Sequence, residues 1–181
     1  SLLVTSLSVA DTKIEPRARD LGIPFSGTPG PLNSITDIEG LEVGHTTVIK
    51  GDNVRTGVTT IFPLGKKNPR GVRAAMSTIN GTGEVTGAHV VNELGIMFGP
   101  VMMTNTWSVG TVRNGYLKWV KENQPEGLRA LFSLPVIAET SDEGLNDIYG
   151  MHVTEDHVIS ALNSAASGPI LEGSVGGGTG M

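Results

Sequence analysis

Four polar clusters framed by glycine contain the side chains of this sequence that could take part in chemistry. Each lies at or just beyond the end of a predicted strand, where loops bring polar groups into a site while the strand holds them in place. The clusters are Asn80-Gly-Thr-Gly-Glu84, Thr104-Asn-Thr-Trp-Ser108, Glu139-Thr-Ser-Asp142 with Asn146-Asp147, and Gly176-Gly-Gly-Thr-Gly180. Their amide, carboxylate and backbone groups suit a polar pocket with amide or amine chemistry.

Glu139 follows the apolar run LPVIA, so its carboxylate lies at the rim of a predicted buried strand. Such a carboxylate is well placed to receive the ammonium group of a ligand. It is equally well placed to form a structural ion pair or a helix cap. The sequence spacing alone gives these interpretations equal weight.

Asn105 and the glycine run each allow a functional and a structural interpretation. The Asn105 amide could donate to a substrate carbonyl or a developing oxyanion, although such an asparagine more often bonds the neighbouring backbone. Consecutive glycines can expose N–H groups to a phosphate, but GSVGGGTG lacks the Lys-Ser/Thr ending of a P-loop. We therefore favour close approach of the backbone to another segment or to a substrate, at Gly176, Gly177 and Gly178.

Other common catalytic sites find little support in the sequence. Serines, histidines and aspartates are present, but the nucleophile elbow GxSxG does not occur. The absence of cysteine excludes a thiol nucleophile, disulfides and thiolate metal sites. The four histidines show no metalloprotease spacing with an intervening glutamate, and His152 and His157 are too far apart to share a helical face. We expect neither a metal nor an organic cofactor.

The elements that must position the clusters are strands and helices in mixed order. The pattern predicts a strand-and-turn region with a hairpin at 35–49, a strand at 55–65, and a strand or short helix at 72–79. It next predicts a helix start at Glu84, a buried strand at 99–106, and an amphipathic helix within 108–124 that Pro125 ends. The last elements are a strand at 131–140 and a helix within 152–167, which Thr154 caps and Gly168-Pro169 stops. This mixture predicts an α+β or layered α/β fold.

Length and charge limit the classes of partner. A chain of 181 residues with 38% hydrophobic residues is expected to fold as one domain. Its net charge of −5 and its scattered basic residues argue against nucleic acid as a partner, and we expect no membrane partner.

Both ends of the chain carry a pattern of their own. Residues 1–10 are apolar and small, which suits either an export-signal remnant or an ordinary N-terminal arm, and we favour the arm. The sequence leaves the cellular location open between cytoplasm and periplasm. Met181 falls within a glycine-rich loop, so we expect the chain to be one piece of a larger folded unit.

Six strings occur in an order that resembles a known family. They are TPGPLNSITDIEGLEVGHTT, RTGVTTIFP, NGTGEVTG, GPVMMTNTWSVG, LPVIAETSDEGLNDIYGMHVT and EGSVGGGTGM. Together, from about Ala18 to Met181, they closely resemble the α-subunit of the DmpA and BapA family, which contains L-aminopeptidase/D-amidase/D-esterase and β-aminopeptidase enzymes.

The resemblance implies a precursor that cleaves itself at a Gly-Ser bond. The freed serine, at the start of a downstream β-subunit, would be the nucleophile, so this chain alone is expected to be inactive. The implied fold is a four-layer αββα sandwich, similar to that of N-terminal-nucleophile hydrolases. Residues 18–181 would be the upstream part of this single catalytic domain, completed by a second chain or segment, with 1–17 as the arm. The αβ units are expected to form a homo-oligomer.

The resemblance also assigns roles to residues. Glu139 matches the family glutamate that holds the free amino group of the substrate, which makes such enzymes exopeptidases. The residues expected to shape or support the pocket are Asn105, Thr106, Asn146 and Asp147. Two positions depart from the family pattern, because Ser141 often corresponds to an aromatic residue and Ser174 to an asparagine. Ser141 would widen or polarise the pocket, so substrate preference carries over less safely than reaction type.

The predicted function is therefore a self-processing serine aminopeptidase or amidase. It would remove N-terminal residues, with D- or β-amino acids as candidates, from short peptides, amides or esters. One alternative is a related self-processing amidohydrolase or acyltransferase, which a requirement for a free amine would distinguish. Another is a non-catalytic binding or assembly fragment, which the missing nucleophile favours.

Overall fold

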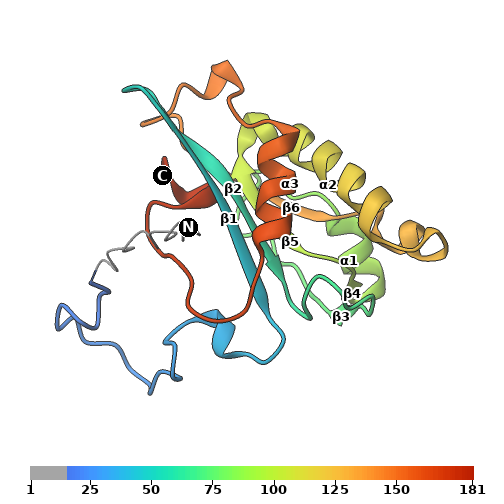
Figure 1. Ribbon diagram of the computed structural model, residues 1–181, viewed down its shortest axis with the longest axis horizontal. Helices are drawn as coiled ribbons and strands as arrows, with labels where there is room; N and C mark the ends of the chain where they lie inside the picture. Colours follow the sequence, from blue (N-terminus) through green and yellow to red (C-terminus); the bar gives the residue numbers. More distant parts are fainter. Residues whose placement is uncertain (1–15) are drawn as a thin grey trace, which may run out of the picture.

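One mixed sheet of four strands forms the centre of the molecule, and two helices cover one of its faces (Figure 1). The computed structural model describes residues 16–181, so residues 1–10, interpreted as an N-terminal arm or an export-signal remnant, lie outside the described residues. The strand order is β1-β2-β5-β6, with antiparallel pairing except between β5 and β6. Helices and strands thus alternate in the mixed order that the sequence predicts.

A long hairpin forms one side of the sheet. Strand β1 (Glu42–Lys50) pairs along its whole length with β2 (Val54–Phe62). The hairpin predicted within 35–49 is wrong, because β1 runs without a turn through Gly44. A Cβ at Gly44 would lie 2.1 Å from the carbonyl oxygen of Ala161. This glycine therefore admits a closely packed helix and does not make a turn.

A strand–helix–strand unit forms the other side. Strands β5 (Val101–Asn105) and β6 (Val136–Thr140) run parallel, so a crossover must connect them. The crossover consists of α2 (Val109–Asn123) and a 3₁₀ segment (Glu126–Phe132). The strand at 99–106 and the helix within 108–124 are confirmed, but 131–140 forms a strand only from Val136 because the 3₁₀ segment occupies its start.

Helix α3 (Glu155–Ser164) begins as predicted, with Thr154 as its N-cap. The Thr154 backbone N–H donates to His157 Nδ1 at 3.1 Å, which completes a capping box. The helix ends before Gly168 because Ala166 pairs with Val43 of β1 through two backbone hydrogen bonds of 3.0 and 3.1 Å. Pairing with the sheet therefore ends the helix earlier than the Gly-Pro signal predicts.

Short elements close the lower end of the molecule. Strands β3 (Val72–Arg73) and β4 (Ile96–Met97) pair with each other, so the segment 72–79 is a strand only at its start. Helix α1 (Ala88–Leu94) starts four residues after the predicted position at Glu84. Residues 84–86 instead lie extended beside β6, which excludes a helical start there.

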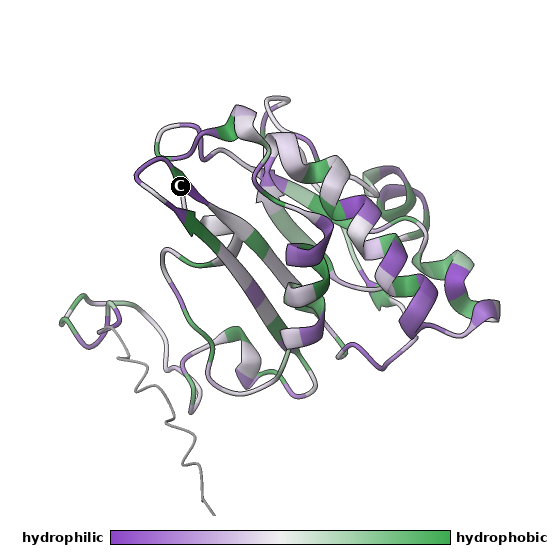
Figure 2. Cartoon of the chain, turned by 45° about the horizontal axis from the view of Figure 1, so that its top comes forward, coloured by the Kyte–Doolittle hydropathy of each residue, from purple (hydrophilic) through white to green (hydrophobic). Residues whose placement is uncertain are grey.

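The core lies between the sheet and the two long helices. Apolar segments of the strands alternate with polar ones, and α2 and α3 show apolar and polar bands (Figure 2). The fully buried residues of this core include Val58, Met102, Ile137, Val112, Tyr116, Val158 and Leu162. No helix within residues 16–181 is long and apolar enough to cross a membrane.

The sheet face away from α2 and α3 carries the segment that leads to the C-terminus (Figure 1). A 3₁₀ turn at Gly176–Gly178 packs against β1, β2 and β5 on this face.

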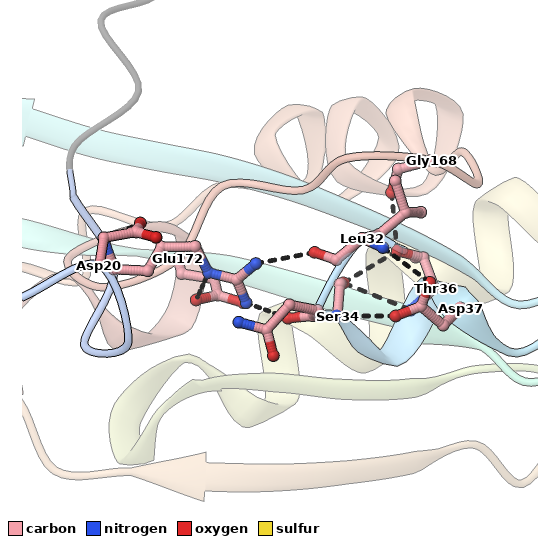
Figure 3. A network of polar contacts seen from close by, with 9 residues as sticks. Asp20, Leu32, Ser34, Thr36, Asp37, Gly168 and Glu172 are labelled. Atoms are coloured by element: carbon pink, nitrogen blue, oxygen red, sulfur yellow. Dashed lines mark hydrogen bonds and ion pairs between the residues drawn. The ribbon is translucent and has the colours of Figure 1, made fainter. Parts of the chain in front are cut away.

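The N-terminal loop is tied to the same segment. The Arg17 guanidinium contacts Glu172 and donates to the Leu32 carbonyl at 2.8 Å, while Thr36 Oγ1 donates to the Gly168 carbonyl at 2.7 Å (Figure 3). Arg17 and residues 32–36, near the two ends of this loop, therefore lie beside residues 168–172.

We expect Gly44→Ala to destabilise the fold, because its Cβ would collide with backbone atoms of α3. Overpacking of this kind lowers the free energy of unfolding by about 2–3 kcal/mol. The matched control is Gly110→Ala on α2, where the added Cβ meets nothing within 4 Å. This substitution should raise the free energy of unfolding by about 0.5–1 kcal/mol. Denaturant unfolding measures both changes. Equal effects of the two substitutions would contradict the close packing of α3 on β1.

Candidate functional site

The parallel pairing of β5 with β6 brings Thr106 and Glu139 together. Thr104 lies opposite Glu139 in this register, so the residues that follow β5 emerge beside the end of β6. The Thr106 hydroxyl donates to Glu139 Oε2. Glu139 lies at the rim of the sheet, as the apolar run before it predicts, and is only partly buried.

A loop from another part of the sequence reaches the same carboxylate. The Glu139 backbone N–H donates to the Glu84 carbonyl at 3.0 Å, and Val85 forms an antiparallel bridge with Ala138. Gly83 therefore lies next to Glu139, where a Cβ would be 3.0 Å from Oε1. The sequence marks 80–84 as a polar cluster, but no local signal indicates that it pairs with β6.

Asn105 lies beneath this edge and is 1% exposed. Its Nδ2 donates to Thr56 Oγ1 of β2 at 2.8 Å, and its Oδ1 has no hydrogen-bond partner among the described residues. The amide nitrogen that could have donated to an oxyanion thus donates to a side chain of the neighbouring strand β2. A contribution of Asn105 to the pocket stays a prediction.

Asn146 joins the loop after β6 to the start of β2. Its Nδ2 donates to Asp142 Oδ1 at 3.1 Å, and its Oδ1 accepts from the Arg55 backbone N–H at 3.1 Å. Both Asn146 and Asp142 are buried. Asn146 can support the pocket through these two hydrogen bonds. The sequence assigns no role to Asp142. Its charge alone does not indicate a buried side chain, and its burial is apparent only from the fold.

Within residues 16–181, neither Asp147 nor Ser141 forms a hydrogen bond with Glu139. The Asp147 backbone N–H donates to the Asn53 carbonyl at 2.7 Å, and its carboxylate lies 3.0 Å from His152 Nε2. Ser141 is exposed just after β6. The structure thus groups Glu139 with Thr106 and Asn105 with Thr56, while Asp147 belongs to a separate surface pair.

The glycines of the C-terminal turn approach the open sheet face closely. A Cβ at Gly177 would lie 2.7 Å from the Met103 carbonyl oxygen. The Gly177 N–H donates to Thr59 Oγ1, and the Gly177 carbonyl accepts from Thr140 Oγ1, both at 3.0 Å. These bonds join the turn to both β2 and β6.

His45 extends this arrangement and was noted in the sequence only for its spacing. Its Nδ1 lies 2.9 Å from Thr59 Oγ1. Burial lowers the pKa of His45, and a hydrogen bond with the Leu171 backbone partly opposes the shift. The side chain lines a groove of about 300 Å³ on the open face. Other residues of this groove are Val43, Ile61, Met103, Ile170, Leu171 and Val175.

Metal binding finds no candidate in the part of the chain that the structure describes. Within residues 16–181, no three side chains of His, Asp or Glu gather closely enough to hold an ion. The site can therefore offer a carboxylate, hydroxyls and backbone groups, which suit an ammonium or amide ligand.

Comparisons with known proteins agree on one family. The profile of peptidase family S58 matches residues 33–181. The β-peptidyl aminopeptidase BapA of Sphingosinicella xenopeptidilytica is 52% identical over 99% of this chain and 46% of that protein. The BapA of Sphingosinicella microcystinivorans is 48% identical over 92% of this chain and 43% of that protein. The chain therefore spans about half the length of these relatives.

Solved structures show the same fold. The L-aminopeptidase D-Ala-esterase/amidase of Ochrobactrum anthropi, described as a variant of the Ntn hydrolase fold, matches with a TM-score of 0.83 and 41% identity, over 92% of this chain and 49% of that chain. A Burkholderia sp. β-aminopeptidase matches with a TM-score of 0.83 and 45% identity, over 91% and 48%. The predicted α+β class and the likeness to N-terminal-nucleophile hydrolases are confirmed.

We expect Asn146→Ala to destabilise the protein strongly. The substitution leaves Asp142 Oδ1 and the Arg55 N–H without their partner, which costs about 2–3 kcal/mol of the free energy of unfolding. The control is its neighbour, Asp147→Ala, which removes a partly exposed pair worth at most about 1 kcal/mol. Denaturant unfolding of both variants gives the comparison. If Asp147→Ala costs as much as Asn146→Ala, the buried connection does not stabilise this edge.

Proposed function

The chain belongs to peptidase family S58, and from this premise we propose that it is the upstream part of a self-processing serine aminopeptidase. The proposed substrates are short peptides, amides or esters with a free amino group, with D- and β-amino acids among the candidate N-terminal residues. The observation that carries the proposal is the carboxylate of Glu139, which lies near the end of β6 with one oxygen that has no hydrogen bond within residues 16–181.

The contacts of Glu139 support a role in binding an ammonium. Oε2 accepts from Thr106, which orients the carboxylate, whereas Oε1 has no hydrogen bond within residues 16–181. No lysine or arginine of the described chain forms an ion pair with it. A substrate ammonium would supply the missing opposite charge through a charge-assisted hydrogen bond. A substrate with a capped amine would leave the carboxylate unpaired, which explains exopeptidase selectivity.

The nucleophile in this proposal is a serine at the start of a second segment, released by self-cleavage of a precursor. Its hydroxyl oxygen would attack the substrate carbonyl while its α-amine, or a neighbouring group, takes the proton. The leaving amine or alcohol would then receive that proton, and water would hydrolyse the acyl-enzyme. Because the chain spans about half of its relatives, the remaining half would contain this serine.

The open sheet face supports the proposed domain organisation. Its groove is lined by apolar side chains of β1, β2 and β5. Burying such a surface is favourable in proportion to its area. A second sheet from the downstream segment would fill it and complete an αββα sandwich of which 18–181 is the upstream part, with 1–17 as an arm. A homo-oligomer of the resulting αβ units is part of the same proposal.

Self-processing predicts two polypeptides in the purified full-length protein. We expect intact-mass measurement and N-terminal sequencing to find this chain together with a second one that begins with serine. The two should also co-elute in gel filtration, because the apolar face is covered by the partner. A single uncut polypeptide with aminopeptidase activity would contradict self-processing, and this chain purified alone would favour the binding or assembly fragment.

Amine recognition predicts that Glu139→Gln impairs the full-length enzyme. With L-alanine or β-alanine p-nitroanilide, we expect kcat/KM to fall about 100-fold, because the ammonium loses its charged partner. The control is Glu143→Gln, an exposed carboxylate four residues away that should have little effect. The N-acetylated substrates should not be hydrolysed. Equal hydrolysis of free and acetylated substrates would instead favour a related amidohydrolase or acyltransferase.

A further inference from the structure

We propose that Gly83 is a specificity-determining position of the amine site. Because it carries no side chain, it leaves Glu139 Oε1 open to the substrate ammonium. This inference rests on the proposed function of Glu139 and adds to it a second residue, from a loop 56 positions earlier in the sequence.

The position of Gly83 is fixed by the segment that follows it. Residues 84–86 lie antiparallel to β6, with the Glu139 N–H bonded to the Glu84 carbonyl and the Thr86 N–H bonded to the Ile137 carbonyl, both at 3.0 Å. The Thr86 hydroxyl donates to the Pro135 carbonyl at 2.6 Å. The same hydroxyl accepts from the Ile137 N–H at 3.0 Å. Four hydrogen bonds therefore hold this segment in register with β6 and keep Gly83 beside the carboxylate.

The two oxygens of Glu139 have different surroundings. Oε2 is occupied by the Thr106 hydroxyl, so Oε1 is the oxygen left for a ligand. A Cβ at Gly83 would lie 3.0 Å from Oε1, closer than ordinary van der Waals contact. To admit a Cβ, the carboxylate must shift by a few tenths of an ångström. A larger side chain at Gly83 needs more of the space beside Oε1, so we expect it to restrict access of a ligand to that oxygen or to shift the carboxylate relative to Thr106.

Backbone conformation does not explain this glycine. Gly83 is not among the residues with positive φ, so an L-residue can adopt its backbone angles without strain. Its neighbour Gly81 shares this property, but a Cβ at Gly81 would meet nothing within 4 Å. In what a Cβ would contact, the two glycines therefore differ only by the Glu139 carboxylate beside Gly83.

The test uses Gly83→Ala and Gly83→Val in the full-length enzyme, with Gly81→Ala and Gly81→Val as matched controls. With L-alanine p-nitroanilide, we expect KM to rise about 5-fold for Gly83→Ala and about 30-fold or more for Gly83→Val, while kcat changes less than about 2-fold. The inhibition constant of L-alaninamide, which presents the same ammonium, should rise in parallel. Both Gly81 variants should stay within about 2-fold of the parent enzyme.

The outcomes separate this inference from the proposed function. If Glu139→Gln impairs the enzyme but the Gly83 variants keep the parent KM and inhibition constant, the inference on Gly83 is wrong and the proposed function stands. Equal changes at Gly81 and Gly83 would also overturn it, because only Gly83 adjoins the carboxylate. If Glu139→Gln has no effect, the proposed amine site itself fails, and the inference fails with it.

Discussion

The parallel pairing of β5 with β6 is the constraint on which the candidate site depends. Two parallel strands end at the same edge of a sheet, so Thr106 and Glu139 meet although 33 residues separate them. Parallel pairing requires a crossover, and α2 supplies both that connection and five residues of the buried core. The burial of α2 against the sheet therefore stabilises the same register that sets the carboxylate beside its hydroxyl partner.

The close approach of backbone segments at glycine residues is the second constraint on the structure. At Gly44, the missing side chain admits the end of α3, and at Gly177 it admits the terminal turn onto β5. In both places a Cβ would meet a backbone oxygen at less than 3 Å, so the neighbour has little freedom to move. These glycines weaken their own segments through conformational entropy, and the gain is a layered packing that larger residues would prevent.

Local signals in the sequence predicted elements better than contacts. The β-branched run of β2 and the Thr154 cap of α3 were recognisable because each depends on neighbouring residues. The turn predicted at Gly44 is absent, because a glycine that marks a turn and one that admits a helix look alike in sequence. Glu139 was found from the apolar strand before it and from the family motifs. The bond from Asn105 to Thr56 spans 49 residues, and two polar side chains at that distance leave no pattern.

The energetics of this edge connect the amine site to the proposed second segment. Asn105 Oδ1 and Asp142 Oδ2 are buried acceptors without hydrogen-bond partners in residues 16–181, and an unpaired buried acceptor costs about 1–3 kcal/mol. Asn105 bonds to Thr56 of β2, and Asp142 bonds to Asn146 in the loop after β6, so both lie close to the strand ends that position Thr106 and Glu139. Burial of the apolar groove by the proposed second segment would stabilise this same sheet and offset that cost. Assembly and amine recognition therefore depend on one sheet.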